Sequence, residues 1–339
     1  MSKQSELVGL ARTTNLDEVN AAYSAGALSN RNVILNGSMQ VAQRGASFNA
    51  PQNYTLDRWK SLRYAANSYT VSLQPTGGLS GFSKCARIQR NAGDTTSGNN
   101  PITFNQPVEQ KSCDGLIGKT VTLSFWVRVG SDFSANTSSF YSAVAYTTNT
   151  TDIGMYYGNF YSNGTSLSQV MPVSTSWTYV THIVAIPSSA KQVGVAFSGD
   201  YWAGTAGAND YYEITGVQLE VGDTATPFEH RSYGQELALC QRYYQECIIK
   251  DRVFCSYNNS SASYGGSFQW RTVMRVAPTA QGGTNASAYA SDNYTAVPNR
   301  QVMIQTTYAE GCQAYLDYDT AGAHTWFVRA DSFLLDAEL

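Results

Sequence analysis

Residues 211–247 read YYEITGVQLEVGDTATPFEHRSYGQELALCQRYYQEC, and this stretch divides the chain into two parts. Its first eleven residues alternate in polarity, which predicts a β-strand with two distinct faces. We expect one face to present Tyr211, Glu213, Thr215, Val217, Leu219 and Val221. The opposite face would present Tyr212, Ile214, Gly216, Gln218 and Glu220. Gly222 and Asp223 end the strand, and Pro227 prevents a helix from following at once.

A short connector helix is predicted next, over residues 231–248. Ser232 is a suitable N-cap, and Gln235 stands three residues later, where a capping box places its Glu or Gln. Helical spacing aligns four apolar residues that we expect to pack in the linker or between subunits: Leu237, Cys240, Tyr244 and Cys247. Gln241, Arg242 and Gln245 are expected on the opposite side.

The composition favours β structure along the whole chain. Only 14% of the residues are charged, while the chain holds 23 tyrosines and 28 glycines. Long helices and coiled coils need many Ala, Glu, Lys and Leu residues, so an all-β fold is predicted. The length of 339 residues suggests about two domains.

Charge and hydropathy argue against two kinds of partner. The net charge is −3 and the chain has no basic stripe, which argues against nucleic-acid binding. The sequence has no run of about 18 apolar residues and no charged-then-apolar leader, so we expect neither a membrane span nor a signal peptide. The six cysteines form no CxxC pair and have no metal-ligand spacing.

The clearest strand before the connector is residues 121–129. Its apolar face would present Val121, Leu123, Phe125, Val127 and Val129, and its polar face Thr122, Ser124, Trp126 and Arg128. Further strands are predicted near residues 69–73, 86–90, 140–146, 177–186 and 192–197, with turn clusters between them. Short strands without intervening amphipathic helices predict an antiparallel sandwich of the jelly-roll type over residues 31–230.

The remaining segment, residues 249–339, is predicted to form a smaller C-terminal β domain. Five strands are expected there, near residues 252–257, 267–276, 301–308, 313–317 and 324–329. The Ala-, Ser-, Asn- and Gly-rich residues 278–298 are expected to form a loop. A domain of this size has a marginal core by itself, so we expect it to lean on partner chains.

Residues 1–30 differ from the rest and cannot bury much surface by themselves. Two interpretations remain open: a disordered leader, or an arm that becomes ordered on a neighbouring protein or on another copy of the chain. In the second interpretation the anchoring side chains are Leu7, Val8, Leu10, Leu16 and Val19.

Three motifs resemble a family of bacteriophage tail-fibre and virion-appendage proteins. Residues 217–245, VQLEVGDTATPFEHRSYGQELALCQRYYQ, are similar to the family's linker of the form QLE-G-ATPFE-R-EL-CQRYY. The opening Arg31–Met39, with Gln43–Gly45 and Asp57–Trp59, is similar to the family's N-I-NG-M, QRG and DRW motifs. The closing residues ADSFLLDAEL are similar to its DAEL-type finish.

The resemblance covers roughly residues 31 to 339. It implies a jelly-roll sandwich like that of carbohydrate-binding modules, followed by a small C-terminal β domain. It also implies a homotrimer that is assembled in the bacterial cytoplasm, where free thiols persist, and that becomes part of the virion. Residues 1–30 would attach to other virion proteins of the tail, neck or fibre.

We therefore expect a non-enzymatic virion structural protein, a tail-fibre or appendage subunit that binds host-surface polysaccharide. A purely architectural fibre, neck or decoration protein without a ligand is the alternative. A polysaccharide depolymerase is the third interpretation. It would need two carboxylates around a cleft, for which the candidates are Asp200, Asp210, Glu213, Asp317 and Asp319.

The sequence offers no motif for catalysis, and no catalytic residue is predicted. It contains no GxSxG elbow, no Walker A motif, no HExxH and no dinucleotide-binding fingerprint. The three histidines, His182, His230 and His324, are far apart in the sequence, and we interpret each as structural or as a surface residue.

Aromatic side chains are the candidate contacts for a sugar, because flat rings stack on pyranose faces. Trp126 is the most conspicuous, since it lies on the polar face of its strand beside Arg128. The candidate glycan-binding residues are Trp126, Tyr156, Tyr157, Tyr161, Tyr201, Trp202, Tyr257, Tyr264 and Trp270. Packing between subunits is the alternative role for these rings, because aromatic residues are enriched at interfaces. Trp59 is expected in the core.

No cofactor is predicted, and no metal-binding motif is present. A structural calcium ion remains an alternative, because jelly rolls of this type often hold one. Asn36, Asp57 and Asp210 are oxygen donors near predicted strand ends, although no EF-hand spacing accompanies them.

Overall fold

A computed structural model describes residues 30–338 except 65–67, 99–100, 136–138, 157, 200–201, 249–252, 257–265, 270, 282–285, 291–295, 301, 308, 310, 317–324 and 330–331. The predicted anchoring residues Leu7, Val8, Leu10, Leu16 and Val19 lie outside these described residues. The chain forms two compact units, and the division falls between Arg231 and Ser232.

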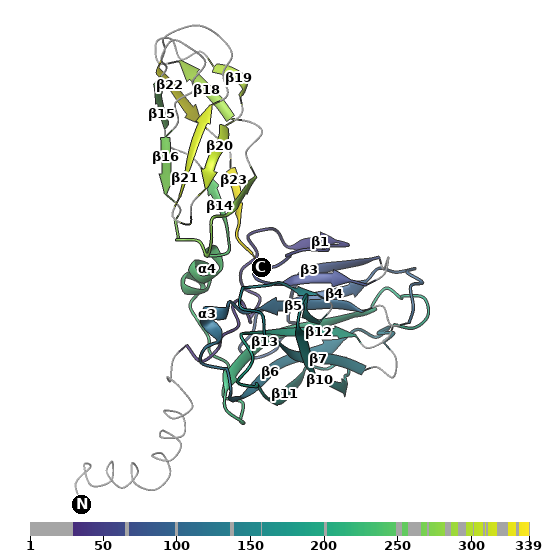
Figure 1. The fold of residues 1–339 in the computed structure, drawn as a ribbon. Helices are drawn as coiled ribbons and strands as arrows, with labels where there is room; N and C mark the ends of the chain where they lie inside the picture. The colour runs from purple at the N-terminus through teal and green to yellow at the C-terminus, as the bar shows by residue number, and fades with distance from the viewer. Residues whose placement is uncertain are drawn as a thin grey trace, which may run out of the picture. The chain divides into compact units, whose positions relative to one another are not determined.

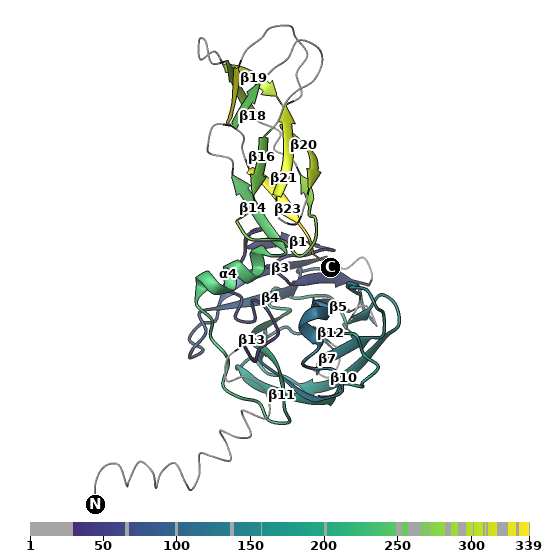
Figure 2. The same cartoon turned by 60° about the vertical axis from the view of Figure 1, so that its left-hand side comes forward.

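The first unit is an antiparallel jelly-roll sandwich, as predicted, and Figures 1 and 2 show its two sheets as layers. The six-stranded sheet has the order β1 (Ser47–Asn49), β3 (Tyr69–Pro75), β4 (Lys84–Arg90), β13 (Tyr211–Val221), β6 (Thr120–Val129) and β11 (Thr178–Ala185). The five-stranded sheet has the order β10 (Gly164–Pro172), β7 (Ser139–Thr147), β12 (Gln192–Gly199), β5 (Ile102–Pro107) and β2 (Lys60–Arg63). A hairpin of β8 (Met155–Tyr156) and β9 (Asn159–Phe160) accompanies the five-stranded sheet.

The core lies between the two sheets. The predicted apolar face of β6 is confirmed, since Val121, Leu123, Phe125, Val127 and Val129 all belong to this core. Trp59 is completely buried, as predicted, and its ring stacks on Phe104 at 4.7 Å between centroids. Its indole nitrogen donates to the backbone oxygen of Asn36, so the ring's one polar atom is satisfied within the core.

The strand β13 does not keep the simple alternation predicted for it. Thr215 pairs with Trp126 of β6, but Gln218 pairs with Ser124, so two residues of β13 oppose Phe125 alone. This β-bulge shifts the alternation by one residue. Tyr212 and Ile214 therefore enter the core together with Val217 and Leu219. The prediction that these two pairs lie on opposite faces is wrong, because an extra residue inverts the face of every residue after it.

Two short helices are described. The helix α3 (Gln110–Cys113) follows β5, and α4 (Tyr233–Gln241) begins the second unit. The predicted cap of α4 is confirmed, because Ser232 and Gln235 form a complete capping box. Among the described helices, none is long and apolar enough to cross a membrane.

The connector helix is shorter than predicted, which changes the proposed packing stripe. The helix ends at Gln241, so Tyr244 and Cys247 belong to the strand β14 (Tyr244–Ile248) and share no helical face with Leu237 and Cys240. Cys240 is buried and Leu237 is half-buried. Gln245, which was expected to face away, is 1% exposed and donates to the backbone oxygen of Thr272.

The second unit contains further antiparallel strands in three sheets. The first sheet is β14, β23 (Ser332–Asp336) and β17 (Thr279–Gln281). The second is β15 (Val253–Ser256), β22 (Thr325–Arg329), β18 (Ala286–Ala290) and β19 (Ala296–Arg300). The third is β16 (Gly266–Gln269), β21 (Gly311–Leu316) and β20 (Val302–Thr307).

Two sequence predictions for this unit are wrong. Residues 278–298 are not one loop, because β17, β18 and the start of β19 lie within them. The strand expected over 267–276 ends at Gln269. The first error arose where small residues hide the alternation of polarity, and pairing of β17 with β23 and of β18 with β22 decides the structure there.

Candidate functional site

The outer face of the six-stranded sheet carries a row of charged residues. Glu213 on β13 lies between Arg87 on β4 and Arg128 on β6, each a direct cross-strand neighbour. The Arg87 Nε atom donates to Glu213 Oε1 at 2.8 Å, and the Arg128 Nε atom donates to Glu213 Oε2 at 2.5 Å. The carboxylate is completely buried, whereas 25% of the Arg87 side chain and 22% of the Arg128 side chain are exposed.

An aromatic ring supports each arginine of this row. The Arg87 guanidinium carbon lies 3.9 Å from the centre of the Tyr211 ring, and that of Arg128 lies 4.7 Å from Trp177. The Trp177 indole nitrogen donates to the backbone oxygen of Thr76 at 2.9 Å, which fixes this ring. Cation–π contacts of this kind restrain the guanidinium groups while their edges stay free to donate.

A second aromatic pair lies next to the row. Trp126 on β6 and Tyr179 on β11 are cross-strand partners, and their ring centres are 5.2 Å apart. The Trp126 side chain is half-buried, and Tyr179 is 42% exposed. We call Arg87, Arg128, Trp126, Tyr179 and Trp177 the outer-face site. Trp126 is the one residue of this site that the sequence analysis named as a glycan contact.

The bulge glycine sits against this pair. Gly216 has φ +63°, and a Cβ atom there would lie 2.8 Å from Phe82 Cζ and 3.1 Å from Trp126 Cδ1. The ring of Phe82 packs against Phe228 at 5.1 Å and His230 at 5.3 Å. His230 is thus a surface residue with ring contacts, in agreement with its predicted role.

Two further candidates lie on the opposite side of the sandwich. Tyr156 in β8 is 45% exposed and Tyr161, just after β9, is 77% exposed. Their rings meet edge to face at 5.7 Å. The hairpin that carries them covers small residues on the outer face of the five-stranded sheet, such as Ala143 and Ala196.

Trp202 is not an exposed aromatic residue, and that prediction is corrected. Its ring is 2% exposed, belongs to the main core, and contacts Phe133 at 5.6 Å and the Arg90 guanidinium at 5.3 Å. The Trp202 ring is buried because the Trp202 backbone forms isolated β-bridges with Gly98 and with Ala135, and these bridges hold its loop against the sandwich. The remaining candidates, namely Tyr157, Tyr201, Tyr257, Tyr264 and Trp270, lie outside the described residues.

Those predicted acids and oxygen donors that the structure describes are already paired. Glu213 accepts from two arginines, and Asp210 accepts from Arg90 and Ser134. The Asp57 carboxylate accepts from the backbone and side chain of Gln43, and burial raises its pKa. The side-chain oxygen of Asn36 accepts from the Val41 backbone. Within the described part of the chain, no group of three or more His, Cys, Asp and Glu side chains is arranged to hold a metal.

His182 is buried at 7% exposure on the inner face of β11, between the half-buried Val180 and Val184. Its Nδ1 atom lies 3.5 Å from Ser142 Oγ, and burial lowers its pKa. The predicted structural role of this residue is confirmed by its position. Asp200, Asp317, Asp319 and His324 lie outside the described residues.

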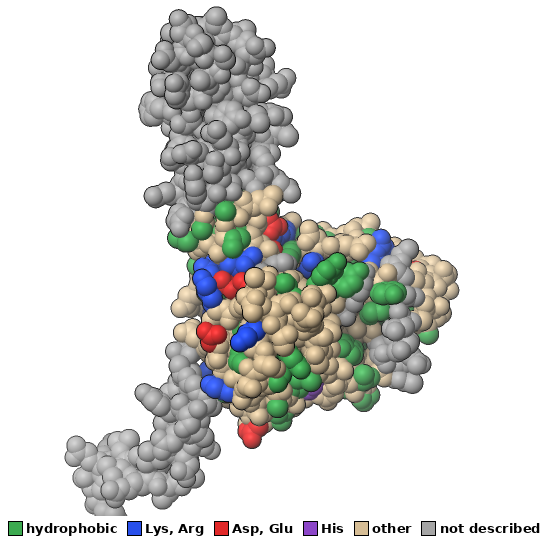
Figure 3. All heavy atoms as spheres, in the orientation of Figure 1, with side chains coloured by type: hydrophobic (Ala, Val, Ile, Leu, Met, Phe, Trp, Pro, Cys, Tyr) green, Lys and Arg blue, Asp and Glu red, His purple; other side chains and the backbone are tan. Residues whose placement is uncertain are grey.

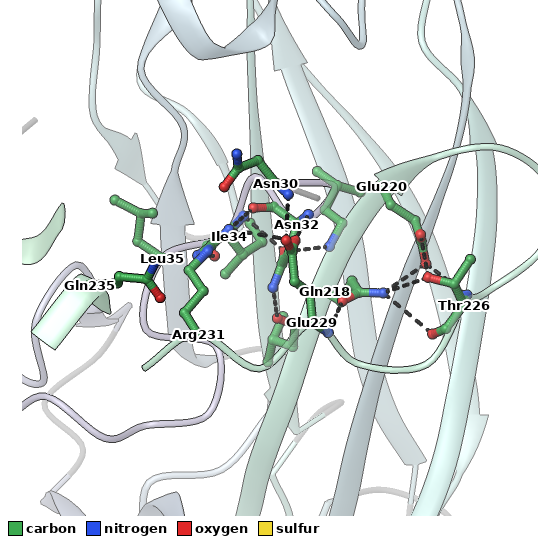
Figure 4. Close-up of polar contacts among 12 residues, drawn as sticks. Asn30, Asn32, Ile34, Leu35, Gln218, Glu220, Thr226, Glu229, Arg231 and Gln235 are labelled. Carbon is green, nitrogen blue, oxygen red and sulfur yellow. Dashed lines mark hydrogen bonds and ion pairs between the residues drawn. The ribbon is translucent and has the colours of Figure 1, made fainter. Parts of the chain in front are cut away.

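The motif residues from the two ends of the sandwich meet in one hydrogen-bonded network, which we call the clamp (Figure 4). The Glu229 carboxylate accepts from the backbone nitrogens of Asn30 and Asn32, the latter at 2.8 Å. The Asn32 side chain in turn bonds Val217 and Leu219 of β13. The Arg231 guanidinium donates to the backbone oxygens of Asn32 and Ile34.

The other half of the clamp orders the turn after β13. Glu220 accepts from the backbone and hydroxyl of Thr226, and Gln218 bonds Glu220 and the Glu229 backbone (Figure 4). Gln218 and Glu220 are buried, so their polar atoms need these partners. The motif residues therefore close the sandwich by joining its first segment to its last strand.

Figure 3 shows one face of the molecule, where apolar side chains form small separate patches among polar ones. The exposed aliphatic residues of the sandwich include Val170 on β10 and Ile183 on β11, each 52% exposed.

No family model and no curated protein sequence matches this chain. Among solved structures, the chain is similar to the enzymatically active domain of bacteriophage CBA120 tailspike protein 4, with a TM-score of 0.37 and 15% identity over 57% of this chain and 22% of that chain. The chain thus spans about a fifth of that tailspike chain.

Two carbohydrate-binding modules are also similar. One is the C-terminal family 22 module of Clostridium thermocellum Xyn10B, with a TM-score of 0.32 and 14% identity over 54% of this chain and 98% of that chain. The other is TmCBM61, solved in complex with β-1,4-galactotriose, with a TM-score of 0.30 and 11% identity over 57% of this chain and 100% of that chain.

Proposed function

We propose that this chain is a non-enzymatic subunit of a bacteriophage virion appendage, and that its sandwich binds a host-surface glycan through the outer-face site. The observation that carries the glycan part is the combination of partly exposed rings, Trp126 and Tyr179, with partly exposed guanidinium groups, Arg87 and Arg128. Rings stack on pyranose faces, and guanidinium N–H groups donate to sugar oxygens.

The site is rigid, which favours binding. Both β13 and β6 have strand partners on each side, and the rings of the site contact one another or an arginine. A ligand would therefore find the side chains already in position, with little conformational entropy left to lose.

The virion part of the proposal is supported by the motif resemblance. The motif residues Gln218, Glu220, Glu229 and Arg231 form the clamp, so they have a clear reason to occur together in a sandwich of this kind. A non-enzymatic role is supported by Glu213 and Asp210, because each is committed to arginine. We place the protein in the virion, with residues 1–30 as its attachment to other virion proteins.

Binding of the full-length chain to an array of bacterial surface polysaccharides tests this function. We expect Tyr179→Ala and Trp126→Ala to weaken binding about tenfold, the effect of removing a stacked ring. Tyr161→Ala removes a ring that is 77% exposed on the opposite side of the sandwich, and it is expected to leave binding unchanged. Thermal unfolding of each variant shows whether the fold is kept.

Two results would contradict the proposal. Binding that survives both outer-face substitutions but is lost in Tyr161→Ala would move the glycan site to the β8–β9 hairpin. A folded chain that binds no polysaccharide on the array would favour the architectural alternative. That alternative has its own support in Val170 and Ile183, which expose aliphatic surface on the edge strands β10 and β11.

A further inference from the structure

The charge of the outer-face site does not cancel. Glu213 is one carboxylate between two guanidinium groups, so the row keeps a net charge of +1. This positive face belongs to a chain whose net charge is −3, so the excess is local to the site.

Both arginines have N–H groups left to donate. Arg128 contacts Glu213 through Nε, and among the described residues no hydrogen bond involves its two terminal nitrogens. Arg87 uses Nε and Nη2 on the same carboxylate, which leaves Nη1. A Cβ atom at Gly77 would lie 3.8 Å from both terminal nitrogens of Arg128, so the turn at Gly77 lies near these nitrogens and places no side chain against them.

The free N–H groups of the two arginines favour an anionic ligand. The guanidinium carbons of Arg87 and Arg128 lie over the rings of Tyr211 and Trp177, and both arginine side chains stay partly exposed. A guanidinium edge pairs with a carboxylate through two parallel hydrogen bonds, which a neutral hydroxyl cannot match. Trp126 and Arg128 stand two residues apart on β6, about 7 Å along the strand, so one ligand can reach both.

We propose that the glycan is an acidic polysaccharide, whose sugar carboxylate binds Arg128 and Arg87 while a sugar ring of the same chain lies on Trp126 and Tyr179. This inference rests on the glycan binding proposed above and adds the chemical class of the sugar. Glu213 acts as the positioning residue, because it holds both arginines through their Nε atoms.

Matched pairs of polymers test the carboxylate directly. The full-length chain is titrated with polygalacturonate, hyaluronate and polysialate, and with the methyl-esterified or carboxyl-reduced form of each. We expect binding to at least one acidic polymer, a loss of about tenfold or more in its neutralised form, and weaker binding in high salt. Equal binding to an acidic polymer and its neutralised form would overturn the inference and leave the proposed glycan binding intact. No binding to any polymer, acidic or neutral, would contradict both.

Substitutions test whether the sugar carboxylate binds the arginines of the outer-face site. Arg128→Gln is expected to weaken binding to the acidic polymer about tenfold or more, and to weaken binding to its neutralised form much less. Arg128→Lys keeps the positive charge but lacks the paired N–H donors of a guanidinium. We therefore expect this variant to bind the acidic polymer better than Arg128→Gln does, but less tightly than the parent chain. Lys111→Gln removes the same charge from an exposed position on α3, outside the site, and serves as the control. Equal losses in Lys111→Gln and Arg128→Gln would reduce the effect to overall charge and reject the site.

Discussion

Buried ionisable side chains of the sandwich have partners that fix their roles. Glu213 and Asp210 are both completely buried, and each faces arginine. Asp210 also accepts from the Ser134 backbone and hydroxyl, so it ties the start of β13 to the loop after β6. A carboxylate that is fully occupied in this way orients its neighbours, and for Glu213 those neighbours are the arginines of the outer-face site.

His182 gives a prediction about pH. Burial lowers its pKa below 6.5, so the unfolded chain binds this proton more readily than the folded chain does. Stability linked to His182 is therefore complete above pH 6.5 and is lost as the pH falls below it. We expect His182→Gln, compared with the parent chain in urea unfolding at several pH values, to reduce the loss of stability on acidification. An identical pH dependence of the two chains would contradict this role.

At the scale of elements, the bulge in β13 decides which residues reach the outer-face site. It lets Tyr212 and Ile214 fill the core beside Val217 and Leu219, and it leaves Glu213 and Thr215 outside. The positive φ of Gly216 and its contact with Phe82 and Trp126 require a residue without a side chain.

Gly216→Ala should therefore destabilise the protein. The left-handed backbone alone costs about 1–2 kcal/mol for alanine, and the contact of the new Cβ with Phe82 adds to this. We expect a loss of about 1–3 kcal/mol in the free energy of unfolding, measured in urea. Gly115→Ala is the matched control, because it has no positive φ and nothing lies within 4 Å of its added Cβ. Equal stabilities of the two variants would show that the bulge does not need glycine.

At the scale of the whole molecule, the resemblance predicts a trimer. The strands β10 and β11 lie at the same rim of the sandwich in both views (Figures 1 and 2), and Val170 and Ile183 expose aliphatic surface there. We expect light scattering of the full-length chain to give three times the 36.9 kDa chain mass. Val170→Ser with Ile183→Ser should dissociate it, while Tyr161→Ser should not. A monomeric parent chain at micromolar concentration would rule out this assembly.

Much of the fold was predictable from local patterns. The alternation of residues 121–129 identified the core face of β6, and Ser232 with Gln235 identified the start of α4. Trp59 was placed in the core, and Trp126 on the outer face next to Arg128. These features depend on neighbours a few residues apart, which a sequence pattern records directly.

The rest of the site needed contacts between distant segments. Tyr179 and Trp177 join Trp126 and Arg128 only because β11 pairs with β6, and Arg87 joins them only through β13. Tyr179 had no signal of its own in the sequence beyond its place in a predicted strand. Trp202 resembled an exposed loop residue until backbone bridges to Gly98 and Ala135 drew it into the core.

The sequence by itself determined the β class, the cap of the connector helix and the chemical types available at the surface, because short-range periodicity and turn chemistry set these. Only the tertiary structure decided which face each residue of β13 takes after Gly216. It also brought the opening and linker motifs together in the clamp, and it placed Arg87, Glu213 and Arg128 in one row. The physical reason is strand pairing: one extra residue in a strand inverts the faces that follow, and partners far apart in sequence become neighbours without any local sign.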